Sequence, residues 1–329
     1  MHNKSFTLVS LFFAGFILIF TALFSYFLCK KSVYESQKGL IIASTNLDEV
    51  AKVFRRERIV NNADIARFYL RLARAFGYQI RIGEFAIPSN VSLREAIEIL
   101  DRAKSIVHKI CIYEGMSVFL FLKRLEKDEY LLGKVEQVPA EGSLMPATYS
   151  FTYPTTRQEI IFMAQKAMRE FIKREWPRRA PNCIMKTPEE ALTLASIVEK
   201  ETSLESEKNL VAGVYGHRLR IGMRLQADPT TIYAFKRGDV LGRRLTHTDL
   251  KYDDPYNTYR YKGLPPGPIA NPGRSSIMAV LHPEDTDFLF FVCSNNSGHI
   301  FSKTFEEHKE KIKAIRKAKS TAAKVKSTN

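Results

Sequence analysis

The sequence predicts an α+β protein with a single N-terminal transmembrane helix, a small α/β unit and a larger α+β domain. Three observations lead to this prediction. The first is an uncharged run of 23 residues near the N-terminus, and the second is an alternation of strand-like and helix-like patterns over residues 39–104. The third is the length of residues 105–308, which is sufficient for a second domain with its own core.

The predicted transmembrane helix is residues 6–28, preceded by residues 1–5. The run carries no charge, and as a helix it would extend about 34 Å, enough to cross a bilayer core of roughly 30 Å. A cleaved signal peptide is the alternative, but the run is longer than such a peptide requires, and no small-x-small cleavage site follows it. Three lysines after the span outnumber Lys4 before it, so the positive-inside rule alone would place the domains in the cytoplasm.

The unit over residues 39–104 shows the order strand, helix, helix, strand, helix. The expected segments are a strand at 39–42, helices over 47–54 and 65–72, a strand at 78–82 with a turn at 83–85, and a helix over 92–100. Ser92 and Glu95 form a capping box at the start of the last helix. The arginines of this unit form either a solvated face or a polymer-binding face; they are Arg55, Arg56, Arg58, Arg67, Arg71, Arg74 and Arg81.

The larger domain, residues 105–308, begins with a strand-like stretch over 106–112 and an apolar helix over 118–125. A turn-rich stretch at 141–149 and a helix around 158–171 follow. The last segment, residues 309–329, holds eight Lys and Arg residues and one Glu, and this charge of +7 indicates a solvated tail or a frayed helix.

The composition of the 329 residues is that of a globular protein with excess positive charge. Hydrophobic residues make up 45% and charged residues 26%, which excludes a disordered or fibrous chain. The net charge of +15 suggests an anionic partner: nucleic acid, phospholipid or an acidic polymer. The four cysteines show no C-x-x-C spacing, so we expect free thiols and neither a disulfide framework nor a zinc site.

Standard catalytic motifs are missing from the sequence. It contains no GxxxxGK[ST], GxGxxG, HExxH or GxSxG, and its seven histidines do not pair at metal-ligand spacing. Nucleotide, zinc and serine-hydrolase chemistry are therefore not expected, and we predict no metal and no cofactor.

The stretch 187–202 predicts a helix that carries the candidate acid. Thr187 is the expected N-cap, Pro188 occupies the first helical position, and Glu190 closes a capping box. Near the other end of the helix stand two further carboxylates, Glu199 and Glu201.

Glu201 projects between Leu194 and Ile197, on an otherwise apolar face of this helix. Burial there would raise its pKa, as a general acid near neutral pH requires. Glu199 lies on the other flank, near Leu192, and is the competing candidate. A third interpretation is that both carboxylates are exposed charges of the last helical turn.

Two further stretches of the chain are informative about function. They are 223–231, with the sequence MRLQADPTT, and 256–273, which includes YNTY and GLPPGPIANPG. Prolines and glycines restrict the backbone of the second stretch, while its amides and tyrosines can bond to and stack on sugars. The alternative is a purely structural loop.

These motifs together resemble a known family. ASIVEKET, RLRIGMRLQADPT, YNTY, GLPPGPIANPG and the terminal GHIFS occur in the order typical of the YceG-like (MltG) family of membrane-anchored endolytic murein transglycosylases. The resemblance runs from the apolar segment to about residue 310. It implies one N-terminal span, a LysM-like subdomain at 39–104 and an α+β catalytic domain at 105–308.

The resemblance assigns the catalytic acid to the second Glu of IVEKET, Glu201. It implies a lyase that cleaves the MurNAc-β-1,4-GlcNAc bond within peptidoglycan strands, leaves 1,6-anhydroMurNAc ends and terminates glycan polymerisation. Because the C6 hydroxyl of the sugar replaces water, no second catalytic carboxylate is required. We expect the cleft wall to contain Gln226, Asp228, Thr230, Asn257, Tyr259 and Asn271.

Two residues depart from the family pattern: His217 stands where the family often has Asn, and Ala227 where Thr is usual. They put the substrate preference in doubt more than the reaction, and His217 is either a cleft residue or a helix-surface residue. The resemblance also implies a bacterial inner-membrane protein with its catalytic part on the extracytoplasmic side, against the lysine count.

The implied partners are peptidoglycan strands, the lipid bilayer through residues 6–28, and peptidoglycan synthases (penicillin-binding proteins). Nucleic acid is not expected, because no recognition motif accompanies the positive charge. The alternative function is a membrane-tethered peptidoglycan-binding or scaffold protein with little catalysis.

Overall fold

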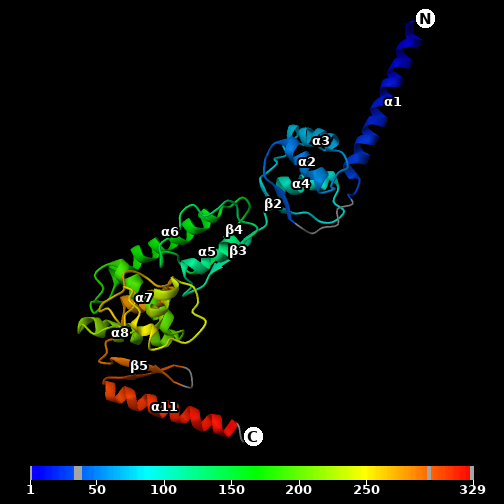
Figure 1. Cartoon of the computed structure of the whole chain (residues 1–329). Coiled ribbons are helices and arrows are strands. Elements are labelled where there is room, and N and C mark those ends of the chain that lie inside the picture. Colours follow the sequence, from blue (N-terminus) through cyan, green and yellow to red (C-terminus); the bar gives the residue numbers. More distant parts are fainter. Residues whose placement is uncertain (1, 33–38, 295–297, 327–329) are drawn as a thin grey trace. The chain divides into compact units, whose positions relative to one another are not determined.

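The computed structural model describes residues 2–32, 39–294 and 298–326, and it gives no side-chain description for residues 1–12, 20, 24 and 319–329. Two compact units make up the chain (Figure 1). Unit 1 comprises Met1–His108 with Ser150–Thr155, and unit 2 comprises Lys109–Tyr149 with Thr156–Asn329.

The predicted span lies within helix α1, His2–Cys29. Among the residues that the structure describes, no helix meets the length and apolarity needed to cross a bilayer. The side chains of 6–12, 20 and 24, which belong to the predicted span, lie outside that described part. The helix itself is therefore confirmed, and its passage through a membrane stays a prediction.

Unit 1 contains strands β1 (Gly39–Ile42) and β2 (Gly83–Ala86), and helices α2 (Leu47–Arg56), α3 (Ala63–Ala75) and α4 (Leu93–Arg102). The strands pair antiparallel, from Gly39 opposite Ala86 to Ile42 opposite Gly83. Phe54, Leu70, Phe85 and Leu100 are fully buried between the helices and this sheet. The predicted capping box is confirmed, because Ser92 and Glu95 satisfy each other's backbone N–H groups.

The strand predicted at 78–82 and the turn predicted at 83–85 are wrong, because residues 83–86 form the strand. Tyr78 N donates to the carbonyl of Ala73 on α3, and groups of Gln79 and Arg81 bond to the end of α4. Gln79 N donates to Asp101 Oδ1 at 2.8 Å, and the guanidinium of Arg81 donates to the carbonyls of Leu100 and Ala103. Residues 78–82 alternate as a strand does, but their hydrogen-bonding groups have other partners.

Unit 2 is mainly helical. Two of its strands extend into unit 1, β3 by its first residue and β4 by its last two. The elements are β3 (His108–Ile112), α5 (Val118–Glu126), β4 (Ala147–Phe151), α6 (Arg157–Glu175), η1 (Trp176–Arg178), α7 (Pro188–Glu201), α8 (Glu205–Arg220), α9 (Asp228–Lys236), η2 (Asp249–Lys251), α10 (Arg274–Leu281), β5 (Phe290–Cys293), β6 (His299–Ser302) and α11 (Phe305–Lys326). β3 pairs with β4, and β5 with β6. The predicted helices at 118–125 and 158–171 are confirmed.

The core of unit 2 forms where α10 packs against both α7 and α8. Ile197, Val198, Val211 and Ile277 are completely buried there. The basic C-terminal segment continues as helix α11 to Lys326, so among the described residues the helical alternative for 309–329 is the one observed.

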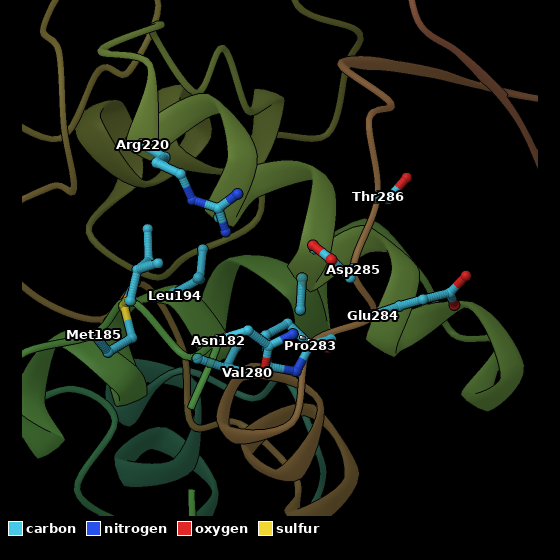
Figure 2. Close-up of a pocket in the computed structure, with 13 residues that line it drawn as sticks. Asn182, Met185, Leu194, Arg220, Val280, Pro283, Glu284, Asp285 and Thr286 are labelled. Atoms are coloured by element: carbon cyan, nitrogen blue, oxygen red, sulfur yellow. Dashed lines mark hydrogen bonds between the residues drawn. The ribbon is translucent and has the colours of Figure 1, made fainter. Parts of the chain in front are cut away.

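A tight contact brings the loop after α10 against α8. An added Cβ on Gly213 would lie 2.2 Å from the carbonyl oxygen of Glu284, so only glycine fits at this position. The small pocket beside this contact is lined by Asn182, Leu194 and Arg220 among others (Figure 2), and its free volume is about 10 Å³. That volume holds about one water molecule, which excludes a sugar ring.

Candidate active site

Helix α7 places the candidate acid at its last residue. The Thr187 side chain caps the start by accepting from Glu190 N at 3.2 Å, while the Glu190 carboxylate accepts from Lys186 N at 2.6 Å. The predicted N-cap Thr187 is therefore confirmed, but the rest of the predicted capping box is wrong. The Glu190 carboxylate accepts from the backbone N–H of Lys186 and not from that of Thr187. At the other end Thr202 is extended, so the helix ends at Glu201.

Glu201 is partly buried, and its carboxylate Oε1 accepts a hydrogen bond from the hydroxyl of Tyr215 at 2.8 Å. Burial raises the pKa of Glu201 to about 7 and outweighs the Tyr215 hydrogen bond, which lowers it. The negative charge of Asp228 raises this pKa further, whereas His299 and Arg218 lower it. A carboxyl group with this pKa exchanges a proton near neutral pH, as general acid–base catalysis requires.

Tyr215 is held rigidly on α8. Its side chain is 1% exposed and meets the ring of Phe291 edge-to-face at 5.8 Å between centroids. The Arg218 guanidinium lies 5.8 Å from the Tyr215 ring and donates to the carbonyls of Leu289 and Leu225. The hydroxyl that contacts Glu201 therefore has little freedom to move.

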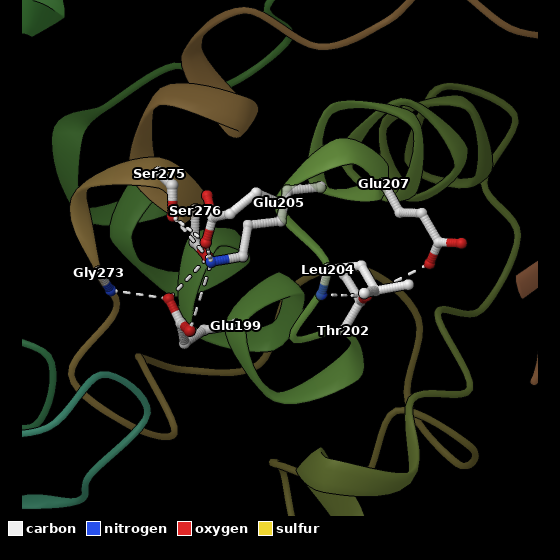
Figure 3. Close-up of polar contacts among 9 residues, drawn as sticks. Glu199, Thr202, Leu204, Glu205, Glu207, Gly273, Ser275 and Ser276 are labelled. Atoms are coloured by element: carbon white, nitrogen blue, oxygen red, sulfur yellow. Dashed lines mark hydrogen bonds and ion pairs between the residues drawn. The ribbon is translucent and has the colours of Figure 1, made fainter. Parts of the chain in front are cut away.

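Glu207, a carboxylate on α8, connects the hairpin of β5 and β6 to this helix. Its two oxygens accept from the backbone N–H of His299 and contact the His299 ring nitrogen Nδ1, both at 2.7 Å. Thr202, the residue after the candidate acid, donates to Glu207 Oε2 at 3.3 Å (Figure 3). Through His299 and Glu207, the GHIFS motif is thus connected to Thr202, the residue that follows Glu201.

Glu199 has a different environment from Glu201. Its Oε2 accepts from Gly273 N at 2.8 Å and Ser276 Oγ at 2.7 Å, and Lys208 Nζ lies 3.6 Å from Oε1 (Figure 3). Lys208 is almost completely buried and also pairs with Glu205 at 2.8 Å. Glu199 therefore joins α7 to α10 and α8, and the idea that both carboxylates are exposed is wrong.

The two predicted stretches are joined by hydrogen bonds, and residues 228–231 of the first stretch begin helix α9. The hydroxyls of Thr230 and Thr258 bond at 2.8 Å, and Thr231 Oγ1 donates to Asn257 Oδ1 at 2.9 Å. This pairing places the Tyr259 hydroxyl on Asp228 Oδ1 at 2.6 Å. In addition to the effect of burial, the negative charge of Asp228 raises the pKa of Glu201, and the charges of Asp228 and Glu201 both raise the pKa of Tyr259, so these three predicted residues lie near one another.

The other predicted cleft residues have different positions. Thr230, Asn257 and Asn271 are completely buried, and their side chains bond to protein groups that hold the loops. Asn271, for example, accepts from Leu144 N and donates to the carbonyl of Met116, both at 2.9 Å. Gln226 is exposed in a left-handed backbone conformation with φ 51°.

Within the described part of the chain, neither of the two departures from the family pattern forms a hydrogen bond with the Glu201 side chain, which accepts from Tyr215. His217 is half-buried on α8, and its buried Nδ1 has no hydrogen-bond partner among the described residues. Ala227 is buried and donates its backbone N–H to Thr258 Oγ1 at 3.0 Å, a bond that needs no side chain.

A hollow of about 260 Å³ lies in unit 2, and Glu201 is not among the residues that line it. Lys200 and Pro229, the chain neighbours of Glu201 and Asp228, lie on its lining, together with Tyr233 and apolar side chains such as Ile232. Tyr233 bonds to the buried Glu141, whose pKa burial raises to about 6. The hollow offers an aromatic ring and polar groups, and Lys200 on its lining precedes the candidate acid in the chain.

Sequence reasoning missed Tyr215, Arg218, Glu207 and His299 as parts of this site. The helical period places Tyr215 and Arg218 on one face of α8, three residues apart, but it does not indicate which helix that face meets. Among the described residues no group of three or more His, Cys, Asp or Glu side chains could hold a metal ion.

Comparison with known proteins gives a consistent picture. A curated protein of Bacillus subtilis named endolytic murein transglycosylase is 34% identical over 244 residues, which are 72% of this chain and 64% of that protein. A Streptococcus pneumoniae protein with the same name is 28% identical over 221 residues, which are 60% of this chain and 39% of that protein. The chain thus spans less than two thirds of the length of these relatives.

A crystal structure of a YceG-like protein from Listeria monocytogenes shares the fold, with a TM-score of 0.52 and 29% sequence identity. The alignment covers 83% of this chain and 98% of that one. The family model described as the YceG-like family matches residues 40–314, which include most of each unit and every residue of the candidate site. The chain therefore belongs to the YceG-like family.

Proposed function

We propose that this protein is an endolytic peptidoglycan lytic transglycosylase, a carbon–oxygen lyase acting on the glycan strands. The observation that carries the proposal is Glu201: a partly buried carboxyl group, held by Tyr215, with its pKa raised to about 7. The names of the relatives point to the same reaction class.

In the proposed reaction, protonated Glu201 gives its proton to the glycosidic oxygen between MurNAc and GlcNAc as that bond breaks. The resulting carboxylate then removes the proton from the C6 hydroxyl of the same MurNAc, whose oxygen bonds to C1. This step closes a 1,6-anhydro ring, returns the proton to Glu201 and consumes no water. The reaction therefore needs one carboxyl group that acts as acid and then as base.

The rigid surroundings of Glu201 support both steps. Tyr215 donates to the carboxylate and therefore stabilises its charged form after the first step. The nearby negative charge of Asp228 opposes ionisation and so favours the proton-donating form. We place the sugar next to the cleaved bond in the hollow lined by Lys200, Pro229 and Tyr233.

The decisive experiment is digestion of purified peptidoglycan with the wild type, Glu201→Gln and Glu189→Gln. Glu189 is an exposed residue of the same helix and serves as the matched control. We expect products ending in 1,6-anhydroMurNAc from the wild type and the control, and none from Glu201→Gln. Reducing ends would indicate a hydrolase, and binding without cleavage by the wild type would favour the scaffold function.

We further propose that α1 anchors the protein in the inner membrane, with both units on the extracytoplasmic side, where peptidoglycan lies. The uncharged run at 6–28 supports this anchoring. Extraction of membranes with alkaline carbonate should leave the protein in the pellet, and protease added outside spheroplasts should digest it. In that position the enzyme would act on nascent strands beside the synthases and terminate their extension.

A further inference from the structure

The part of unit 1 next to the end of α1 carries two hollows of different chemistry. Phe27 and Lys30 line the first, and Leu28 lines the second, so the last turn of α1 borders both. We call the two hollows together the α1-end surface. Its position matters because the apolar run of α1 stops there, at Leu28.

The second hollow is mainly apolar and lies along α3, and the two charged residues on its lining, Arg94 and Glu98, are paired with each other. Its volume is about 220 Å³, and Leu28, Tyr69, Leu72 and Phe76 are among its lining residues. Phe76, at the C-cap of α3, is 76% exposed, and Phe68, two helical turns earlier, is 51% exposed. Residues 68, 72 and 76 are four apart and therefore share one face of the helix, which gives α3 an apolar outer stripe.

The first hollow is basic. Its volume is about 150 Å³, and it is lined by Lys30, Lys31, Arg58 and the side chains of Asn61 and Asn62. Lys31 is paired with Glu95 at 2.7 Å.

Within the described part of the chain, Lys30 and Arg58 have no carboxylate within 4 Å. The Lys30 ammonium lies 5.8 Å from the centre of the Tyr26 ring. Two positive charges beside amide side chains match the chemistry of a phosphate group.

The positions of the two hollows along α1 match the headgroup region and the interfacial region of a lipid bilayer. Lys30 follows the last apolar residue of the run by two residues, a rise of about 3 Å in a helix. Basic residues and tyrosine at this position are typical of the headgroup region, and an aromatic stripe beside them is typical of the interface below it. A soluble acidic polymer would account for the charges but not for the exposed Phe76.

We propose that unit 1 rests on an anionic phospholipid surface through the α1-end surface. Lys30 and Arg58 contact lipid phosphate groups, and Leu72 and Phe76 lie among the outer ends of the acyl chains. The proposal rests on the membrane anchoring of α1 and is independent of the transglycosylase reaction. Its consequence is that unit 1 is oriented relative to the membrane by a second contact besides α1.

The test uses the full chain in nanodiscs of phosphatidylglycerol with brominated acyl chains, which quench nearby tryptophan. The sequence contains one tryptophan, so Trp176→Phe provides a parent without background fluorescence. Phe76→Trp reports on α3, and Ile41→Trp, at an exposed position of β1 in the same unit, is the matched control. If the parent does not fold, both reporters are made with Trp176 retained and its own quenching is subtracted.

We expect at least twofold stronger quenching for the reporter at 76 than for the one at 41. Equal quenching would overturn the proposal. In nanodiscs of phosphatidylcholine the difference should shrink, and the double variant Lys30→Gln/Arg58→Gln should remove the preference for phosphatidylglycerol. An unchanged preference in that variant would refute the phosphate contacts.

Inorganic phosphate separates a lipid site from a site for free anions. Phosphate added to the detergent-solubilised chain should not compete with short-chain phosphatidylglycerol, and effective competition would indicate a free-anion site instead. Release of the chain by alkaline carbonate would refute the anchoring and this proposal together. Loss of the peptidoglycan-cleaving reaction would refute the proposed function alone, because quenching does not depend on it.

Discussion

The substitution Tyr215→Phe tests whether Glu201 acts with the pKa that the structure indicates. The change removes only the hydroxyl that donates to Glu201 Oε1 at 2.8 Å and keeps the ring against Phe291. A hydrogen bond to a charged group contributes roughly 1.5–3 kcal/mol, and 1.36 kcal/mol corresponds to about one pKa unit. Because this bond favours the ionised form, its loss should raise the pKa of Glu201 from about 7 by about one unit or more.

The measurement is the pH dependence of kcat/KM on peptidoglycan strands, followed by release of anhydro-ended products. The limb on which the acid must be protonated should move to higher pH, because the group keeps its proton longer. The rate at the optimum should fall, since the carboxylate formed after the first step has lost a donor.

Tyr149→Phe is the matched control for this experiment. The Tyr149 hydroxyl is buried and donates to the carbonyl of Met145 at 2.6 Å, so the same atom is lost away from Glu201. Its pH profile should match that of the wild type even if its stability drops. A profile of Tyr215→Phe that does not move, or that moves to lower pH, would refute the assignment of Glu201 as the titrating acid.

Three further predictions concern stability. Glu199→Gln should lower the free energy of unfolding by about 2 kcal/mol, because a buried lysine loses part of its charge compensation, whereas Glu189→Gln should leave the melting temperature unchanged. Burial raises the pKa of Glu201 from 4.5 to about 7, so the folded state binds the proton more tightly than the unfolded state does. The stabilisation that this gives below pH 4.5 is lost as the pH rises to 7. In urea titrations the free energy of unfolding of the wild type, relative to that of Glu201→Gln, should therefore fall by roughly 3 kcal/mol between these two pH values. Gly213→Ala should lower the melting temperature, because the added Cβ would lie 2.2 Å from a carbonyl oxygen. Gly216→Ala on the same helix should raise the melting temperature, because its Cβ would have no atom within 4 Å and alanine favours the helix. Equal effects of the two substitutions would contradict the packing described.

Local patterns in the sequence determined most of the helices and the position of the candidate acid. The apolar spacing and capping residues of α4 and α7 are set within one or two helical turns, so they can be read without knowledge of the fold. The family motifs, which are also contiguous, point to Glu201 as the candidate acid. The strand at 78–82 was predicted wrongly because alternation indicates which residues could pair, while β1 has only four residues and pairs with 83–86.

Only the tertiary structure decided what the two carboxylates of α7 do. Glu199 and Glu201 are two residues apart on one helix and equally acidic in sequence. They differ because one meets Lys208 and the start of α10, while the other meets the hydroxyl of Tyr215. The faces that pack together are chosen by burial over the whole unit, and no local pattern records that choice.

The same reason explains why the sequence did not distinguish the roles of the polar residues in the two stretches after α8. The sequence identified Asp228, Tyr259 and Asn271 as polar residues near prolines and glycines, but it could not separate those facing the acid from those that support the backbone. Packing buries Asn271 between two chain segments and leaves Asp228 exposed beside Tyr259. The sequence by itself thus determined which carboxyl groups are candidates, and the long-range contacts of α7, α8 and the two stretches decided how each of these groups is buried and paired.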